Sequence, residues 1–234
     1  MKKGILPTAA ALLVCAALLG VPALWARLAD ARRLNTVQTR PTLTGALDEA
    51  ARAIPVLYEL HASASESLTA DERPEQPDQD PAVLCTDAAG VVTALADAGV
   101  IDAGEQQSLD TLLAQPPATA ACRDTGDCRR TELWWYPPQG DANGISLYYS
   151  RQNSTGALTD LTLPVSGSAD LESRLRAWMT LLGLDALDDW TPLDIRFAAD
   201  STLALYSAKG QATVYGQLSG NYLTLMLMKD KANF

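Results

Sequence analysis

Apolar residues follow a helical spacing in the first half of the chain. Leucine, valine and alanine recur every three to four residues over 81–114, and Asp80 followed by proline is a typical helix start. Gly99 is placed to end a first helix, and Asp102 followed by Glu105 is a capping-box pattern for a second one. The segment therefore predicts a helical hairpin.

The hydrophobic period changes to two at residue 131. Six alternating segments predict strands at 131–136, 144–150, 157–164, 202–207, 211–218 and 221–229. Residues 168–182 predict a helix between the third and fourth strands, capped by Ser168 and ended by Gly183. We therefore expect an α+β fold, in which the hairpin precedes one antiparallel sheet of β-β-β-α-β-β-β order with that helix packed on one face.

Residues 4–26 form a long apolar run that no charge interrupts. As a helix this run would extend about 34 Å, enough to cross a hydrocarbon core of about 30 Å. Trp25 stands where an interfacial aromatic belongs, and basic residues flank both ends. The length favours an uncleaved signal-anchor over a cleaved signal peptide. A lipoprotein signal at Cys15 is a third interpretation, although Val14 replaces the small residue that such a signal requires.

This run determines the expected organisation and location. The tail before it is very short, and a long soluble body can cross a membrane regardless of its charge, so we expect a single-pass membrane protein with its body outside the cytoplasm. The expected parts are a transmembrane signal-anchor with flanks at 1–34, a stalk helix and acidic linker at 35–80, and an extracytoplasmic α+β domain at 81–234, with the hairpin at 81–114 and the sheet plus helix at 131–229. The stalk helix is expected at 42–63, with a kink at Pro55.

Charge is distributed unevenly along the chain. Residues 1–40 carry a net charge of +5 and the remaining residues carry −15. An acidic body repels phosphate backbones, so we expect no nucleic-acid partner. The abundance of alanine, and of arginine over lysine, is typical of a GC-rich bacterial genome.

The stretch ACRDTGDCRR at 121–130 places Cys122 and Cys128 on either side of a polar segment. On a body outside the cytoplasm these two thiols predict a disulfide that closes a small loop, in which Gly126 permits the turn. The spacing is not that of a C-x-x-C redox motif, and no histidine lies nearby to complete a metal site. Cys85 is left over, either as a buried helix residue or as an alternative partner for one of the two.

Catalytic side chains are scarce. His61 is the only histidine and lies on the expected stalk helix, which argues against Ser-His and Cys-His mechanisms. Asp188 and Asp189 with Glu172 could form an acid–base pair, but such neighbours arise by chance in a chain this rich in acidic side chains. We expect no catalytic residues and no cofactor.

A metal site is also not expected. Asp124, Asp127 and Asp141 are close in sequence, but their spacing matches no calcium loop. The segment YYSRQNSTGALTDLTLP at 148–164 resembles the TG-containing hairpin of PepSY-type extracytoplasmic modules over this short stretch alone. Ordinary hairpin geometry explains this resemblance, so it implies no function. Its Asn153-Ser154-Thr155 is a turn that also reads as a glycosylation sequence.

Aromatic residues gather on one predicted sheet face. If Leu133 and Leu147 face the core, alternation turns Trp134, Tyr136 and Tyr148 the other way. The later strands add Tyr206, Tyr215, Tyr222, Met226 and Met228 to that face. A sheet that is apolar on both faces must be covered on both. Either the helical hairpin covers this second face, or Trp134, Tyr136 and Tyr148 form a surface that binds a partner, peptide or glycan.

These features favour a non-catalytic, membrane-anchored bacterial extracytoplasmic protein that binds or organises protein partners in the envelope. A sensor or regulatory subunit of a membrane complex is an alternative, which would need a partner because the leading tail is so short. A hydrolase that uses only carboxylates is a second alternative, which would need a deep cleft with a perturbed carboxylate.

Overall fold

The structure, a computed structural model, describes residues 47–62, 79–136, 144–166, 170–195 and 201–232. These residues belong to one unit, which extends from Leu43 to Phe234. In the part of the chain that is described, no helix has the length and apolar character needed to cross a membrane. The predicted anchor at 4–26 lies outside the described residues, as does most of the acidic linker.

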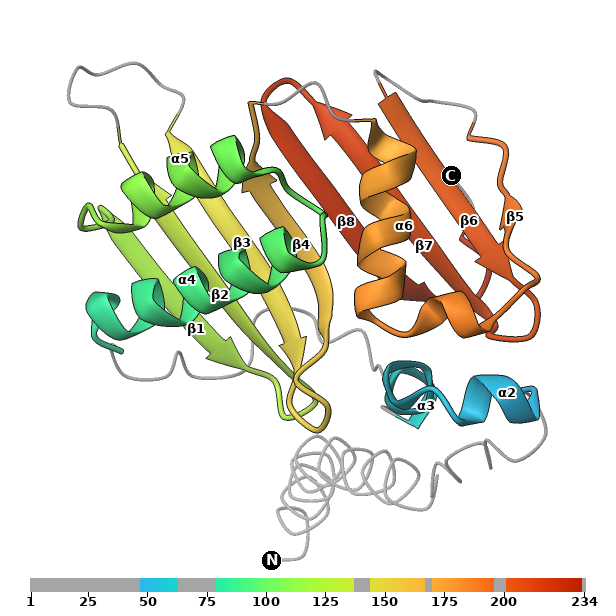
Figure 1. Ribbon diagram of the computed structural model, residues 1–234. Helices are drawn as coiled ribbons and strands as arrows, with labels where there is room; N and C mark the ends of the chain where they lie inside the picture. Colours follow the sequence, from blue (N-terminus) through green and yellow to red (C-terminus); the bar gives the residue numbers. More distant parts are fainter. Residues whose placement is uncertain (1–46, 63–78, 137–143, 167–169, 196–200, 233–234) are drawn as a thin grey trace, which may run out of the picture. The chain divides into compact units, whose positions relative to one another are not determined.

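Eight antiparallel strands form one sheet in the order β1-β2-β3-β4-β8-β7-β6-β5 (Figure 1). The first four are β1 (Thr119–Asp124), β2 (Cys128–Trp135), β3 (Ile145–Gln152) and β4 (Leu158–Pro164). The last four are β5 (Thr191–Pro192), β6 (Ser201–Ser207), β7 (Ala212–Ser219) and β8 (Tyr222–Lys229). The α+β class and the six predicted strands are confirmed, because long period-two segments are the strongest sequence signal for strands.

The expected β-β-β-α-β-β-β order is wrong at both edges of the sheet, since each half has one more strand. The sequence of β1 is TAACRD, in which small alanines occupy both faces and hide the alternation. The other edge strand, β5, has only two residues, which is too short to show a period. The order is therefore β-β-β-β-α-β-β-β-β after the helical hairpin.

The two halves of the sheet repeat one arrangement, a helix followed by four sequential strands. Helix α5 (Ala103–Leu113) precedes β1 to β4, and α6 (Leu171–Leu181) precedes β5 to β8. Both helices begin after an aspartate: Asp102 accepts a hydrogen bond from the amide of Glu105, and Asp170 accepts one from the amide of Ser173. The prediction that Ser168 caps α6 is wrong, since Asp170 is the N-cap of this helix. The halves join where β4 pairs with β8.

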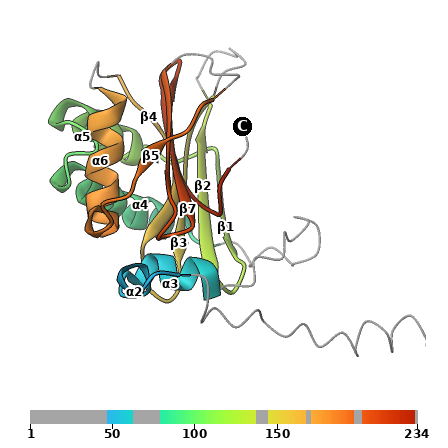
Figure 2. The same cartoon turned by 90° about the vertical axis from the view of Figure 1, so that its right-hand side faces the viewer.

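Helices α4 (Pro81–Asp97), α5 and α6 all lie on the same face of the sheet (Figure 2). Tyr149 of β3 donates a hydrogen bond to Asp87 of α4. Gly216 of β7 lets α6 approach closely, because a Cβ there would lie 3.2 Å from Leu171 and 3.4 Å from Leu175. The helices and this sheet face together enclose the core.

The first of the two alternatives, in which the hairpin covers the second face, is therefore wrong. Buried aliphatic side chains of the long strands line the helical face: Leu133, Leu147, Leu161, Leu163, Leu205, Val214, Leu223 and Leu225. Burial of leucine and valine is more favourable than burial of hydroxyl-bearing side chains, so both sets of helices pack on that face. Helical periodicity shows which side of a helix is buried, but it does not show which sheet face receives it.

The predicted starts of α4 and α5 and the glycines predicted to end α4 and α6 are confirmed. The carboxylate of Asp80 accepts a hydrogen bond from the amide of Ala82, and Asp102 with Glu105 makes both hydrogen bonds of a capping box. Gly99 and Gly183 have φ angles of +78° and +72°, which only glycine adopts at little cost. Local hydrogen bonding therefore determines where these helices begin and end.

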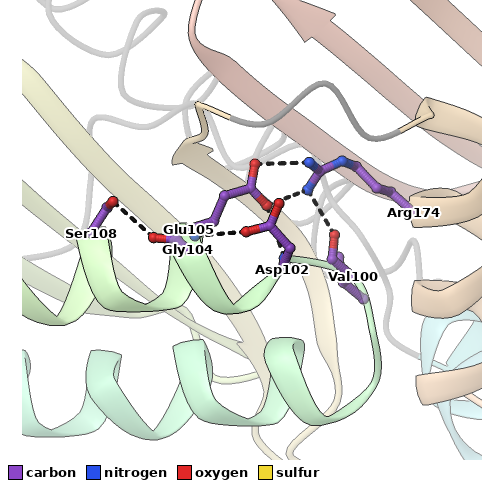
Figure 3. Close-up of polar contacts among 6 residues, drawn as sticks. All are labelled: Val100, Asp102, Gly104, Glu105, Ser108 and Arg174. Carbon is purple, nitrogen blue, oxygen red and sulfur yellow. Dashed lines mark hydrogen bonds and ion pairs between the residues drawn. The ribbon is translucent and has the colours of Figure 1, made fainter.

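A buried ion pair connects the two halves on the helical side (Figure 3). The guanidinium of Arg174 on α6 donates two hydrogen bonds of 2.8 Å to the carboxylate of Glu105 on α5. It donates a third, of 2.9 Å, to the carbonyl of Val100. Glu105 also accepts from the backbone amide of Asp102, so the same carboxylate caps α5 and binds α6.

The predicted stalk helix is, over its described part, packed against the domain. It consists of α2 (Glu49–Arg52) and α3 (Pro55–Ala62), which are separated just before Pro55. Leu57 is fully buried, and His61 hydrogen-bonds the carbonyl of Gly210 in the turn between β6 and β7 at 3.0 Å. Gln152 of β3 donates to the carbonyl of Val56. The apolar side of α3 therefore packs on the sheet and turns of the same domain.

Candidate functional site

The sheet face opposite the helices is called the open face below. Along β8 the side chains alternate, with buried residues on the helical side and half-buried residues on the open face. The register carries this alternation across the sheet. The open face holds Glu132, Trp134, Ser146, Tyr148, Asp160, Thr162, Thr202, Tyr206, Tyr215, Gln217, Tyr222, Thr224, Met226 and Met228.

The three predicted binding residues lie on or beside this face. Trp134 and Tyr148 are half-buried, and Tyr136, just beyond the end of β2, is 64% exposed. The indole nitrogen of Trp134 donates a 2.7 Å hydrogen bond to Glu132 on the same strand. Rigid strands and short polar contacts therefore fix the orientation of the two strand residues.

Tyr148 and Asp160 form a pair on neighbouring strands. The Tyr148 hydroxyl donates a 3.1 Å hydrogen bond to the carboxylate of Asp160. Burial raises the pKa of Asp160, against the opposing effects of Tyr148 and the Arg130 guanidinium. Burial, followed by the Asp160 charge, raises the pKa of Tyr148 above its ordinary range. The phenol therefore remains a hydrogen-bond donor at neutral pH.

Further polar pairs cross the open face. The Tyr222 hydroxyl accepts a hydrogen bond from the amide of Ser146 at 3.2 Å. The hydroxyls of Thr162 and Thr224 lie 3.2 Å apart on adjacent strands. On β7, the Tyr215 hydroxyl donates to the side chain of Gln217. The aromatic residues were predictable from alternation, whereas the polar residues between them give no signal until the strands are placed side by side.

Net charge differs between the helical segments and the strand segments of the domain. The helical segments 80–113 and 170–189 carry eleven acidic residues against two arginines, a net charge of −9. The described strand segments 119–136, 144–166 and 201–232 carry five acidic and seven basic residues, a net charge of +2. Among these described segments, the acidic excess is therefore concentrated in the helical ones.

The predicted acid–base candidates do not come together as a pair. Asp188 forms a 2.6 Å ion pair with Lys209, which lowers the pKa of this exposed carboxyl. Asp189 accepts hydrogen bonds from Ser207 and the amide of Lys209, and its pKa is also lowered. Glu172 pairs with an arginine one turn along its own helix. Lowered pKa values suit structural anions and are unfavourable for general acids.

The predicted Cys122–Cys128 disulfide is not present, and Cys85, Cys122 and Cys128 are free thiols. Cys122 pairs in register with Thr131, whose side chain is buried on the helical side. Cys128 stands an odd number of positions before Thr131 on the same strand, so its side chain points to the opposite face. The pairing fails because the segment forms two strands where the sequence suggested a loop.

Two further candidate residues, Asp124 and Asn153, form hydrogen bonds in the turns at one end of the sheet. Asn153 donates its side-chain amide to Asp124 and to the carbonyl of Gly126, which ties the β3–β4 turn to the β1–β2 turn. Asp124 also accepts from the amide of Gly126. The turn predicted at Asn153 is confirmed, while Asp141 lies outside the described residues.

Among the residues described, no group of three or more histidine, cysteine, aspartate or glutamate side chains is placed to hold a metal ion. Comparisons of the chain with protein families, with curated proteins and with solved structures found no match. The functional argument therefore depends on the open face and its chemistry.

Proposed function

We propose that the chain is a non-catalytic, membrane-anchored bacterial extracytoplasmic protein that binds or organises envelope partners, and that the open face is its binding surface. The observation that carries this proposal is the position of the helices. Within the part of the chain that the structure describes, α4, α5 and α6 lie on one side of the sheet (Figure 2). The strand register places Trp134, Tyr148 and Tyr222 on the other side. Tyrosine and tryptophan are enriched at binding surfaces because they combine a large apolar ring with a hydrogen-bonding group.

The rigidity of the face supports the same proposal. Its polar side chains are fixed by contacts such as Tyr148–Asp160 and Trp134–Glu132. A surface ordered before binding loses little conformational entropy when a partner arrives. The carboxylate hydrolase receives less support, since Asp188, Asp189 and Glu172 are engaged in ion pairs and turn contacts.

Site-specific photocrosslinking in native membranes tests the proposal. A benzophenone amino acid replaces Tyr136, which is 64% exposed beside the open face, in the full-length chain. Replacement of Tyr58 on α3, which is 48% exposed, is the matched control, since both exchanges place the same ring on the surface. We expect discrete crosslinked products from position 136 and none of the same size from position 58.

Two outcomes would contradict the proposal. Equal crosslinking at both positions would show contact without a preferred surface. A lack of products at position 136, at native expression and with the variant present in the membrane, would argue against the open face as a binding surface.

A further inference from the structure

One side of helix α4 forms a hollow with strand β3. Val83, Asp87 and Gly90 are spaced four and three residues apart, so they lie on one side of the helix, with Thr86 beside them. Together with Arg151 of β3 they line a hollow of about 550 Å³, which we call the α4–β3 hollow. This volume is in the range of small-molecule binding pockets, roughly 300–1,000 Å³. Because α4 covers the helical side of the sheet, the hollow is separate from the open face (Figure 2).

The carboxylate of Asp87 in this hollow already has a partner for each oxygen. Its Oδ1 accepts a 2.8 Å hydrogen bond from Nη1 of Arg151, and its Oδ2 accepts one from the Tyr149 hydroxyl. Burial, followed by that hydrogen bond, raises the pKa of Tyr149 above its ordinary range, so the phenol stays neutral. Asp87 is therefore a structural anion that holds Arg151 in place, and it is poorly placed to bind a cation.

Arg151 keeps two donors that the domain does not use. Its guanidinium donates to Asp87 through Nη1, and its Cζ lies 5.5 Å from the centroid of the Tyr149 ring. Among the described residues, none accepts a hydrogen bond from its Nε or Nη2. This edge is the one through which Arg176 binds the carboxylate of Glu172. The Arg151 side chain is 31% exposed, so a ligand can reach the unused edge.

The charges at the hollow favour a ligand with one negative charge. Arg151 and Asp87 compensate each other, and Arg129, within electrostatic reach of Asp87, adds one positive charge. A phosphate dianion would exceed this balance. A carboxylate matches it, and its two oxygens fit the paired donors of a guanidinium edge.

The rest of the lining favours an apolar chain on that ligand. Val83 is 56% exposed, which is unusual for a valine on a packed helix. A Cβ at Gly90 would have no atom within 4 Å, so the space beside the helix backbone is open there. A short hydrocarbon chain placed in this space would remove the Val83 side chain from water, which is favourable.

We infer that the α4–β3 hollow binds a monocarboxylate carried on a short apolar chain. The carboxylate accepts two hydrogen bonds from Nε and Nη2 of Arg151, and the chain lies against Val83 and Gly90. A free branched-chain acid and the C-terminus of a polypeptide that ends in leucine share this chemistry. The inference goes beyond the proposed function, since it assigns a second ligand site on the other side of the sheet.

The test is a titration of the full-length chain in lipid nanodiscs, with ¹⁵N-labelled arginine. The probes are 4-methylpentanoate, its uncharged amide, inorganic phosphate, and the peptide acetyl-Gly-Gly-Leu with a free C-terminus. The methyl signals of the ligand measure affinity, and the Nε–H resonances of the protein show where it binds. We expect the acid and the peptide to shift the resonance of Arg151, which is the one missing from Arg151→Lys, and the amide and phosphate to leave it unchanged.

Arg151→Lys tests the paired donors. Lysine keeps the positive charge and the ion pair with Asp87 but has no planar fork. Binding of 4-methylpentanoate should weaken about tenfold, the loss expected for one charge-assisted hydrogen bond. Arg176→Lys makes the same change at the exposed pair with Glu172 on α6 and should leave the affinity unchanged.

Gly90→Leu tests the location without changing Arg151. The new side chain fills the hollow and should abolish binding, while leucine is favourable inside a helix, so the domain should still fold. Thr111→Leu places the same side chain at an exposed position of α5 and should leave the affinity unchanged. This pair of variants decides the question even if Arg151→Lys fails to fold.

Tighter binding of the peptide than of 4-methylpentanoate would support a polypeptide C-terminus as the occupant, and the reverse order would support a free acid. Equal binding of the acid and its amide would overturn the carboxylate. An equal response to phosphate would overturn the apolar chain, and full affinity in Gly90→Leu would overturn the location. Crosslinking at position 136 reports only on the open face, so this inference and the proposed function fail separately.

Discussion

Arg174 on α6 and Glu105 on α5 each have a side chain only about 1% exposed, and their pairing connects the halves of the domain (Figure 3). Glu105→Ala should lower the free energy of unfolding by about 3–5 kcal/mol, because it leaves a buried guanidinium without its counter-charge. It also removes half of the capping box at Asp102. Thermal or urea unfolding of the full-length chain measures the loss.

Glu172→Ala is the matched control for this prediction. Glu172 pairs with Arg176 on the exposed side of α6, with side chains 55% and 61% exposed. Its removal should cost less than about 0.5 kcal/mol. A loss as small as this for Glu105→Ala would show that the buried pair does not hold the halves together.

His61 gives the domain a defined response to pH, since it is the only histidine in the chain. Burial lowers the pKa of its imidazole below the ordinary 6.5, against the hydrogen bond to Gly210. The unfolded chain then takes up the proton first as pH falls. The contribution of His61 to stability is therefore complete above about pH 6.5 and decreases as pH falls below that value.

We expect the wild type to lose more stability than His61→Gln between about pH 8 and about pH 5. Glutamine retains a donor for the Gly210 carbonyl and does not titrate. Asp160, whose pKa is raised, would act in the opposite direction at lower pH, and the comparison cancels it because both proteins contain it. Parallel pH curves for the two proteins would contradict the burial of a neutral His61.

The packing of helix α3 on the domain depends on one close contact with a turn. It packs on the β6–β7 turn at Gly210, where a Cβ would lie 2.9 Å from Leu187 and 3.2 Å from Leu57. Both leucines are buried, so neither has free space to move. Gly210→Ala should therefore destabilise the domain by about 1–3 kcal/mol through overpacking. Hydrogen exchange should rise first in residues 55–62.

Gly90→Ala makes the same chemical change, and we expect it to have the opposite effect on the free energy of unfolding. Gly90 lies inside α4, and a Cβ there would meet nothing within 4 Å. Alanine should stabilise the helix by about 0.5–1 kcal/mol, because it loses less backbone entropy than glycine. If both substitutions destabilise equally, the steric explanation for Gly210 fails.

For the molecule as a whole, the proposed anchor at 4–26 has a direct test. The full-length chain should remain in membranes during alkaline carbonate extraction, and protease added to cells with a permeabilised outer barrier should digest the body. Leu13→Arg places a charge in the middle of the run, which costs about 2.5–3.5 kcal/mol of insertion, and should release protein into the soluble fraction. Gln38→Arg, outside the run, is the control and should leave the chain in the membrane.

The difference in net charge between helical and strand segments is also a property of the whole molecule. Acidic residues at 80–113 and 170–189 lie on the helical side, whereas sequence order only reveals an acidic body. This asymmetry arises from the topology, which brings two helical segments that are distant in sequence to the same side.

The aromatic part of the site could be predicted and the polar part could not. Alternation alone turned Trp134 and Tyr148 away from the core, because successive side chains of a strand point to opposite faces. Asp160, Thr162 and Gln217 look like ordinary solvent-facing residues until strand order makes them neighbours. β4 pairs with β8, from which α6 and three other strands separate it along the chain, and no local pattern specifies that pairing.

The sequence by itself determined the elements whose causes are local. Period-two segments determined the six long strands, and side-chain capping at Asp80 and Asp102 determined where α4 and α5 begin. These signals are local because each depends on residues within one turn or one strand. Only the tertiary structure decided the sheet order, the shared face of the helices, the separation of Cys122 from Cys128, and the polar contacts of the open face. Each of these depends on which distant surfaces bury the most apolar area together, and that comparison involves the whole chain at once.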